Sequence, residues 1–226
     1  MLLEAGFDPS IRSSRGENAL MLAARAGNVD IVKLLIDHGV DPSVSDSQGC
    51  NVAHYALDSG HVEVIYALRH CKLDWGAKGE MSIHGVMLRG VTALHLAAKH
   101  KDSMLLEYLI DEKLISDIDC ATQSGETPLY IAVWSVQPCN VAVLLSKGAN
   151  AEILGDGHCE SPLHMAARFG DQETVSKFLR HGCDVTIPDG DGLDCQMIAL
   201  KFGFKDLAQT FAQFAQNQGK CRFHTD

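Results

Sequence analysis

The chain has 226 residues, a formal net charge of −10 and a hydrophobic content of 46%. An acidic chain is a poor binder of long nucleic acid or of anionic membranes. Its apolar runs also fall short of the roughly 18 residues that a membrane-spanning helix needs. The eight cysteines form no C-x-x-C pair, which favours reduced, buried thiols. No secretory signal is visible in the sequence, so we expect an intracellular location, in the cytoplasm rather than the nucleus.

An eight-residue pattern recurs along the chain at nearly constant spacing. It reads Gly-Val-Thr-Ala-Leu-His-Leu-Ala at 90–97, Gly-Glu-Thr-Pro-Leu-Tyr-Ile-Ala at 125–132 and Cys-Glu-Ser-Pro-Leu-His-Met-Ala at 159–166. Weaker copies begin at Gly16, Gly49 and Gly192. Successive copies therefore start 33, 41, 35, 34 and 33 residues apart. Such a period predicts a stack of small units, none of which can bury its own apolar face alone.

The repeats can be placed in chain order from this register. Residues 1–12 match the end of a repeat and predict a half repeat, so we expect the chain to be a fragment of a longer protein. Six repeats follow, near 13–45, 46–86, 87–121, 122–155, 156–188 and 189–216. Their first helices should begin near residues 18, 51, 92, 127, 161 and 194. Residues 217–226 are expected to form a disordered tail, so the predicted repeat domain covers residues 1–216.

The fourth repeat shows why each unit should hold two helices. Thr127 can cap a helix with its hydroxyl, and Pro128 suits the first helical position. Gly148 is placed to end the second helix in a left-handed conformation. Two other repeats carry Lys72 and Lys113 at that position. A lysine there must either adopt the strained left-handed conformation or change the helix ending.

The connection between the second and third repeats is longer than the others. Sixteen positions separate Asp74 from Gly90, whereas the sister repeats use 8. The extra segment, residues 75–88, includes Trp75 and is either a functional finger or a surface loop that has drifted in sequence. Shortening it should leave the fold intact, because loop closure depends only weakly on length.

The repeat unit resembles the ankyrin repeat. Thr-Ala-Leu-His at 92–95, Thr-Pro-Leu-Tyr at 127–130 and Ser-Pro-Leu-His at 161–164 correspond to the T-P-L-H of that family. Leu-Leu-x-x-Gly-Ala at 144–149 corresponds to its second-helix ending. The resemblance implies an all-α solenoid of stacked helix pairs with hairpin-like fingers. It also implies that the usual ligand surface is the concave side, which is made of first helices and finger tips.

Metal binding and catalysis find little support. His54, His95 and His164 share one repeat position but are too far apart in sequence to form an H-x-x-x-H pair. The resemblance implies that they tie adjacent repeats together by hydrogen bonds. The chain lacks the G-x-x-x-x-G-K-[ST], G-x-S-x-G and G-x-G-x-x-G motifs. We therefore expect no enzyme activity, no cofactor and no metal site.

A second series of residues points to binding. The two residues after the Ala-Ala pair, or its equivalent, would lie on the concave side by the resemblance, and we call these positions the rungs. With neighbouring finger positions and the long connection, the residues predicted to contact a partner are Arg25, Arg89, Lys99, His100, Trp134, His158, Arg168, Phe169, Lys201, Phe202 and Trp75. Rung cations are also favoured by the helix dipole, which gives them a structural explanation. Exposed aromatic rungs have no such explanation.

These features favour a non-catalytic scaffold for protein–protein interaction, without membrane insertion. Its partner would be a protein or peptide, suited by acidic groups and apolar anchors to the basic and aromatic rungs. The alternative is a sensor module for a small anion or nucleotide, in which Trp134 stacks on a base while Lys99 and Arg168 hold phosphates.

Overall fold

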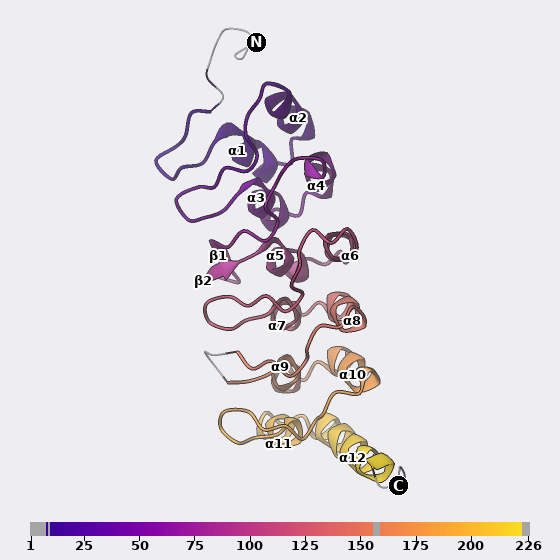
Figure 1. The fold of residues 1–226 in the computed structure, drawn as a ribbon. Coiled ribbons are helices and arrows are strands. Elements are labelled where there is room, and N and C mark those ends of the chain that lie inside the picture. The colour runs from indigo at the N-terminus through magenta and orange to yellow at the C-terminus, as the bar shows by residue number, and fades with distance from the viewer. Residues whose placement is uncertain (1–7, 9, 156–158, 223–226) are drawn as a thin grey trace. The chain divides into compact units, whose positions relative to one another are not determined.

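The computed structural model describes residue 8, residues 10–155 and residues 159–222. Within these residues the chain forms twelve helices and one pair of strands (Figure 1). The chain divides into two compact units, Met1–Ala97 with Tyr108–Ser116, and Ala98–Glu107 with Asp117–Asp226. The predicted half repeat falls mostly on residues 1–7 and 9, which lie outside the described residues.

The first unit stacks two complete helix pairs. They are α1 (Ala19–Arg25) with α2 (Val29–Asp37), and α3 (Val52–Asp58) with α4 (Val62–Leu68). Helix α1 packs against both α2 and α3, and α2 packs against α4. First helices thus lie beside first helices, and second helices beside second helices. The fully buried Leu20, Val32, Leu57 and Ile65 fill the space between them. A third pair, α5 (Ala93–Lys99) and α6 (Met104–Asp111), contributes residues to both units.

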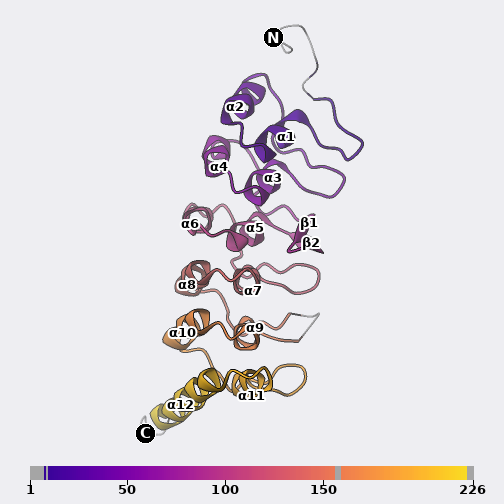
Figure 2. The same cartoon turned by 180° about the vertical axis from the view of Figure 1, so that it is seen from behind.

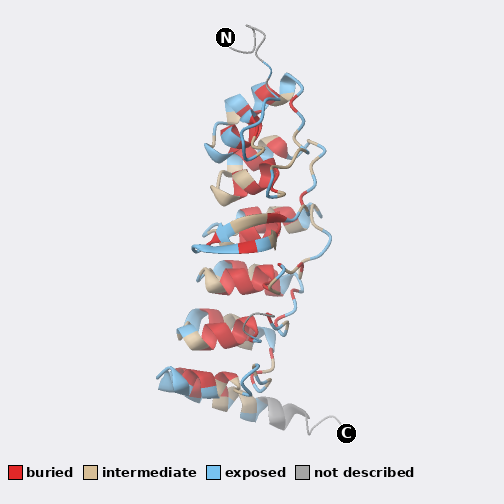
Figure 3. Ribbon diagram, turned by 90° about the vertical axis from the view of Figure 1, so that its left-hand side faces the viewer, coloured by how far each residue is buried: buried red, intermediate tan, exposed pale blue. Residues whose placement is uncertain are grey.

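The second unit repeats this arrangement. Its helices are α7 (Pro128–Trp134), α8 (Pro138–Ser146), α9 (Pro162–Phe169), α10 (Gln172–His181), α11 (Cys195–Lys201) and α12 (Lys205–Arg222). Helix α9 packs against α7, α10 and α11, and α8 packs against α10. In this unit the first helices lie between the fingers and the second helices (Figure 2). They carry more buried residues than the second helices do (Figure 3). The predicted stack of helix pairs is therefore confirmed.

Local capping explains where the first helices begin. Side-chain oxygens at five of the six predicted starts accept a hydrogen bond from a backbone N–H in the first turn; the residues are Asn18, Asn51, Thr127, Ser161 and Asp194. The sixth helix, α5, begins at Ala93, directly after Thr92. All six predicted starts are therefore confirmed. They could be predicted because a cap depends on residues within one turn of it.

The two lysines at second-helix endings behave differently. Lys113 adopts the left-handed conformation, with φ of 53°. In the second repeat the helix instead ends earlier, at Leu68, and Arg69 stays right-handed. Both outcomes that the sequence allowed therefore occur, one in each repeat.

The last helix corrects the predicted disorder of residues 217–222. Leu207, Ala208 and Phe211 are buried and anchor the beginning of α12, which continues to Arg222. Once a helix has formed, each added residue gains a hydrogen bond at little extra entropic cost. Residues 223–226 lie outside the described residues.

The long connection forms a β-hairpin that belongs to the first unit. Strands β1 (Gly79–Ile83) and β2 (Val86–Val91) pair antiparallel. His84 and Gly85 between them both have positive φ, of 51° and 82°, as a tight two-residue hairpin turn requires. Trp75, Ile83 and Leu88 are buried. The predicted partner contact at Trp75 is therefore wrong, since its large ring gains more by packing in the core than by facing solvent.

Candidate interaction surfaces

Arg168, near the end of α9, is held between neighbouring repeats. Its guanidinium forms an ion pair with the buried carboxylate of Glu160 in the same repeat. It also lies over the ring of Phe202 in the next repeat, 5.7 Å from the ring centroid. From the preceding repeat, the hydroxyl of Tyr130 donates to Glu160 Oε1 at 3.4 Å. One chain of contacts thus joins three successive repeats.

Arg25, at the equivalent rung of the first unit, makes the same two kinds of contact. Its Nη1 lies 3.3 Å from Glu17 Oε1, and the guanidinium lies 5.7 Å from the ring centroid of Tyr55 in the next repeat. The Tyr55 hydroxyl donates to Asp46 Oδ2 at 2.7 Å and lies 3.3 Å from Glu17 Oε1. Both rung arginines therefore have carboxylate partners within the protein, so their charges are partly neutralised.

The remaining predicted contact residues differ in accessibility. In the second unit, Phe169 and Phe202 are 44% and 48% exposed, Lys201 is exposed and Trp134 is half-buried. Helices α7, α9 and α11, which carry these rungs, pack side by side. His158 lies outside the described residues.

Three predicted contacts lie elsewhere. Lys99 and His100 are half-buried at the end of α5. The backbone oxygen of His100 accepts a hydrogen bond from Asn140 Nδ2 at 2.6 Å. Arg89 is exposed on β2 and pairs with Glu80 across the hairpin, with Nε 3.3 Å from Oε1.

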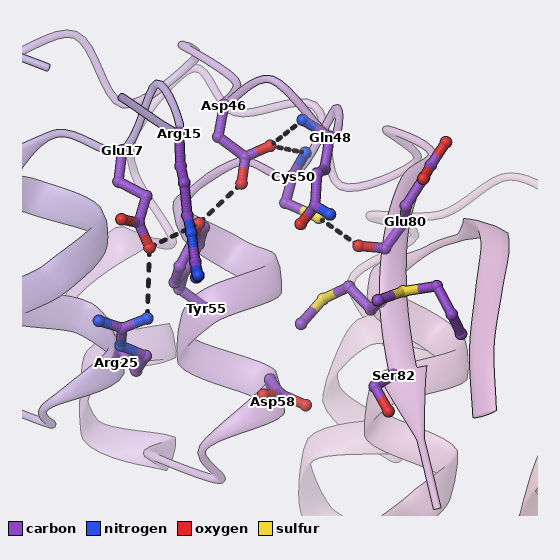
Figure 4. A pocket seen from close by; sticks show the side chains of 12 residues that line it. Arg15, Glu17, Arg25, Asp46, Gln48, Cys50, Tyr55, Asp58, Glu80 and Ser82 are labelled. Carbon is purple, nitrogen blue, oxygen red and sulfur yellow. Dashed lines mark hydrogen bonds and ion pairs between the residues drawn. The ribbon is translucent and has the colours of Figure 1, made fainter. Parts of the chain in front are cut away.

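The first unit contains a cleft of about 220 Å³ that the sequence did not predict (Figure 4). It lies among the first two fingers, α1, α3 and the hairpin of β1 and β2. Its lining residues are Arg15, Glu17, Arg25, Asp46, Gln48, Cys50, Tyr55, Asp58, Glu80, Met81, Ser82 and Met87. One signal was visible in the sequence, since the second repeat carries an aspartate, Asp58, at a rung where four sister repeats carry a cation.

Hydrogen bonds of backbone and side-chain groups hold the walls of the cleft in place. Asp46 Oδ1 accepts from the backbone N–H groups of Gln48 and Cys50, each at 2.8 Å. The backbone N–H of Glu80 donates to Gln48 O at 2.9 Å, and the Cys50 thiol donates to Glu80 O at 3.5 Å. The hairpin is thereby fixed against the second finger. Burial, followed by the charge of Asp46, raises the pKa of Cys50 to about 12.

The buried histidines have structural roles. His54 Nε2 lies 3.0 Å from Val91 O, and His164 Nε2 lies 2.9 Å from Ile187 O. His54 thus links α3 to the residues just before the next helix pair, and His164 links α9 to the connection that follows α10. In the part of the chain that the structure describes, no group of three or more His, Cys, Asp or Glu side chains could hold a metal ion. Among the same residues, no helix has the length and apolar character to cross a membrane.

Helix pairs that recur in register, with fingers between them and their main contacts to neighbouring pairs, define a repeat protein. The model for three ankyrin repeats matches residues 1–82 and 77–155, and the model for one ankyrin repeat matches residues 158–190. The chain belongs to the ankyrin-repeat family. Proteins of this family are generally protein–protein interaction modules.

Segments of two known proteins are similar in sequence to part of this chain. The Nuclear factor NF-kappa-B p105 subunit of Gallus gallus is 32% identical over 145 residues, which cover 56% of this chain and 15% of that protein. The B-cell lymphoma 3 protein homolog of Mus musculus is 27% identical over 139 residues, which cover 61% of this chain and 31% of that protein. The chain thus spans less than a third of either relative.

A solved structure supports the fold independently. The crystal structure of the human ASB11 ankyrin repeat domain superposes with a TM-score of 0.78 at 21% identity. The match covers 93% of this chain and 90% of that chain. At this identity the likeness shows the ankyrin-repeat solenoid fold alone.

Proposed function

We propose that the chain is a non-catalytic interaction module that binds a protein or peptide on the face formed by its rungs and fingers. The observation that carries this proposal is the pair of exposed rings at successive rungs of the second unit, Phe169 and Phe202. Exposed aromatic side chains gain little from folding, whereas aromatic residues are enriched at the energetic centres of interfaces.

Charge suggests what the partner offers to this face. Lys201 is exposed, and the Arg168 side chain keeps 36% of its surface accessible beside Glu160. A partner segment with an apolar anchor next to a carboxylate would complement these side chains. The contacts that hold Arg168 in place reduce the conformational entropy lost on binding.

The sensor alternative is less favoured by the same geometry. A phosphate at Arg168 would lie near the buried carboxylate of Glu160, which would repel it and compete for the guanidinium. A protein partner can instead use the ring of Phe202 and leave the ion pair intact. The free cysteines of the described residues fit a reducing compartment, which we place inside the cell.

Site-specific photo-crosslinking tests the proposed function. The full chain would carry a benzophenone amino acid at Phe169 or, as a matched control, at the exposed Arg180 of α10. We expect discrete protein adducts at position 169 that are missing at position 180 and that Phe202→Ala reduces at unchanged thermal stability. Identical adducts at both positions would show that the rung face has no special role.

A further inference from the structure

We propose that the cleft of the first unit binds a lysine or arginine side chain of the partner, with an apolar neighbour packed on the hairpin methionines. This inference rests on the proposed function and names the chemistry of one part of the binding face. It reverses, for the first unit, the acidic partner that the rung cations suggested.

The size and walls of the cleft suit one long cationic side chain. About 220 Å³ is below the roughly 300 Å³ at which small-molecule sites begin. Met81 and Met87 line the hairpin side, and Met87 is 57% exposed. Flexible thioethers adapt to irregular apolar surfaces, and the aliphatic stems of lysine and arginine provide such a surface.

The charges around the cleft favour a cation. Four carboxylates from four different elements line it, those of Glu17, Asp46, Asp58 and Glu80. Arg15 and Arg25 are the cations among the lining residues, so the formal balance is four negative against two positive, or −2. Figure 4 shows Glu17 and Arg25 on one side of the opening and Glu80 on the other. The carboxylates do not converge on a metal site among the described residues, which favours an organic cation.

Two of these carboxylates are suited to receive a new partner. The Glu80 side chain is 38% exposed, and its cross-strand partner Arg89 is 64% exposed. Such a surface ion pair contributes little to stability and exchanges readily. Asp58 ends α3, where the helix dipole disfavours a negative charge. The dipole of α3 therefore does not account for an aspartate at this rung, whereas a cationic ligand would stabilise its charge.

The neutral groups at the cleft respond to the same negative potential. Burial and then the Asp46 charge raise the pKa of the Cys50 thiol, and Asp58 and Glu80 add to this rise. Burial also raises the pKa of Tyr55, and Asp46 and Glu17 raise it further. The carboxylates that disfavour a negative charge on Cys50 and on Tyr55 would stabilise a positive charge in the cleft.

Methyl NMR of the full chain tests the inference directly. Methionine methyl groups would be labelled with ¹³C, and the signals of Met81 and Met87 assigned through Met81→Leu and Met87→Leu. The probes are the blocked peptides acetyl-Leu-Arg-Leu-amide, its citrulline analogue and its glutamate analogue. We expect saturable shifts at Met81 and Met87 with the arginine peptide, weaker shifts with citrulline, and none with glutamate. The arginine response should weaken as salt is added.

Charge-removing variants supply the second arm of the test. Asp58→Asn should weaken binding of the arginine peptide about fivefold, as loss of one partly exposed charge pair predicts. The midpoint of thermal unfolding should stay equal or rise. Asp37→Asn is the matched control, because Asp37 also ends a helix, α2, but does not line the cleft. It should leave peptide affinity unchanged. Glu80→Gln should also weaken binding and serves if Asp58→Asn lowers the midpoint.

The outcomes separate this inference from the proposed function. Equal responses to the arginine and glutamate peptides, or no shift at Met81 and Met87, would overturn the inference. Unchanged affinity in both Asp58→Asn and Glu80→Gln would do the same. Crosslinks at position 169 would still stand in those cases, so the interaction module would survive without this cationic subsite.

Discussion

The ring of Phe204 lies against Gly170 so closely that a Cβ on that glycine would come 2.4 Å from Phe204 Cε1. His61 covers Gly27 in the same way, with its ring 2.6 Å from the corresponding Cβ position. Both pairs are 34 residues apart. An aromatic residue at the start of one second helix thus packs on the turn glycine of the preceding repeat.

This packing predicts a strong effect of Gly170→Ala. The new methyl group would collide with Phe204, and φ of 67° would strain any side chain. Together these effects should lower the free energy of unfolding by about 2–4 kcal/mol. Gly203→Ala is the control, since Gly203 has φ of 88° but no neighbouring atom within 4 Å of its Cβ position. It should cost only about 1 kcal/mol in urea denaturation. Equal losses would contradict the packing argument.

Val136 occupies the same turn position in the fourth repeat and should be improvable. It adopts φ of 53° and is 56% exposed. A β-branched residue in that conformation is strained, and little packing is lost on its removal. We expect Val136→Gly to raise the free energy of unfolding by about 1 kcal/mol, whereas Val136→Ala should change it less. A lower melting temperature for Val136→Gly would show that the valine makes contacts that outweigh the strain.

The hairpin should be important for stability as well as for binding. Ile83 is fully buried, while its cross-strand neighbour Val86 is 47% exposed. Ile83→Ala should therefore cost about 3 kcal/mol and Val86→Ala less than about 0.5 kcal/mol. Removing residues 76–87 would delete Ile83 as well, so the near-neutral shortening expected from loop closure should not occur. Calorimetric melting of the two alanine variants checks this difference.

Rung cations should differ in their effect on folding. Arg168→Ala would leave the buried Glu160 carboxylate without its charged partner, which should cost roughly 1–3 kcal/mol. Lys201 occupies the following rung and is exposed, so Lys201→Ala should change the free energy of unfolding by less than about 0.5 kcal/mol. Chemical denaturation of both variants decides the point. If Arg168→Ala also left the free energy of unfolding unchanged, the arginine would have no role in folding and could act in binding alone.

Alkaline pH should weaken the first unit through Cys50. Burial, then Asp46, raises the pKa of this thiol from 9.0 to about 12. The folded state therefore holds the proton more tightly than the unfolded state. The associated stability is complete below about pH 9 and is lost as the pH rises towards about 12. Cys50→Ala should flatten this part of the pH profile of urea midpoints, whereas Cys139→Ala, at an exposed thiol, should not. Parallel profiles for all three chains would exclude the contribution of Cys50.

The amino-acid sequence by itself determined the repeat register and the six helix starts. Asn18, Thr127 and Ser161 satisfy backbone groups only three residues away, so their effect can be read without knowing the fold. The same locality explains why a left-handed helix ending could be expected at Lys113. Apolar periodicity then determined which faces must stack.

Only the tertiary structure decided which of the predicted contact residues are exposed. Trp75 could have pointed outward or inward, and its burial depends on the hairpin that follows it. The pairing of Arg25 with Glu17 and its stacking on Tyr55 joins two repeats, as does the chain from Tyr130 through Glu160 to Arg168. The cleft likewise draws its carboxylates from four elements between positions 17 and 80. Contacts at such separations depend on how neighbouring repeats stack, and a pattern read within one repeat carries no information about them.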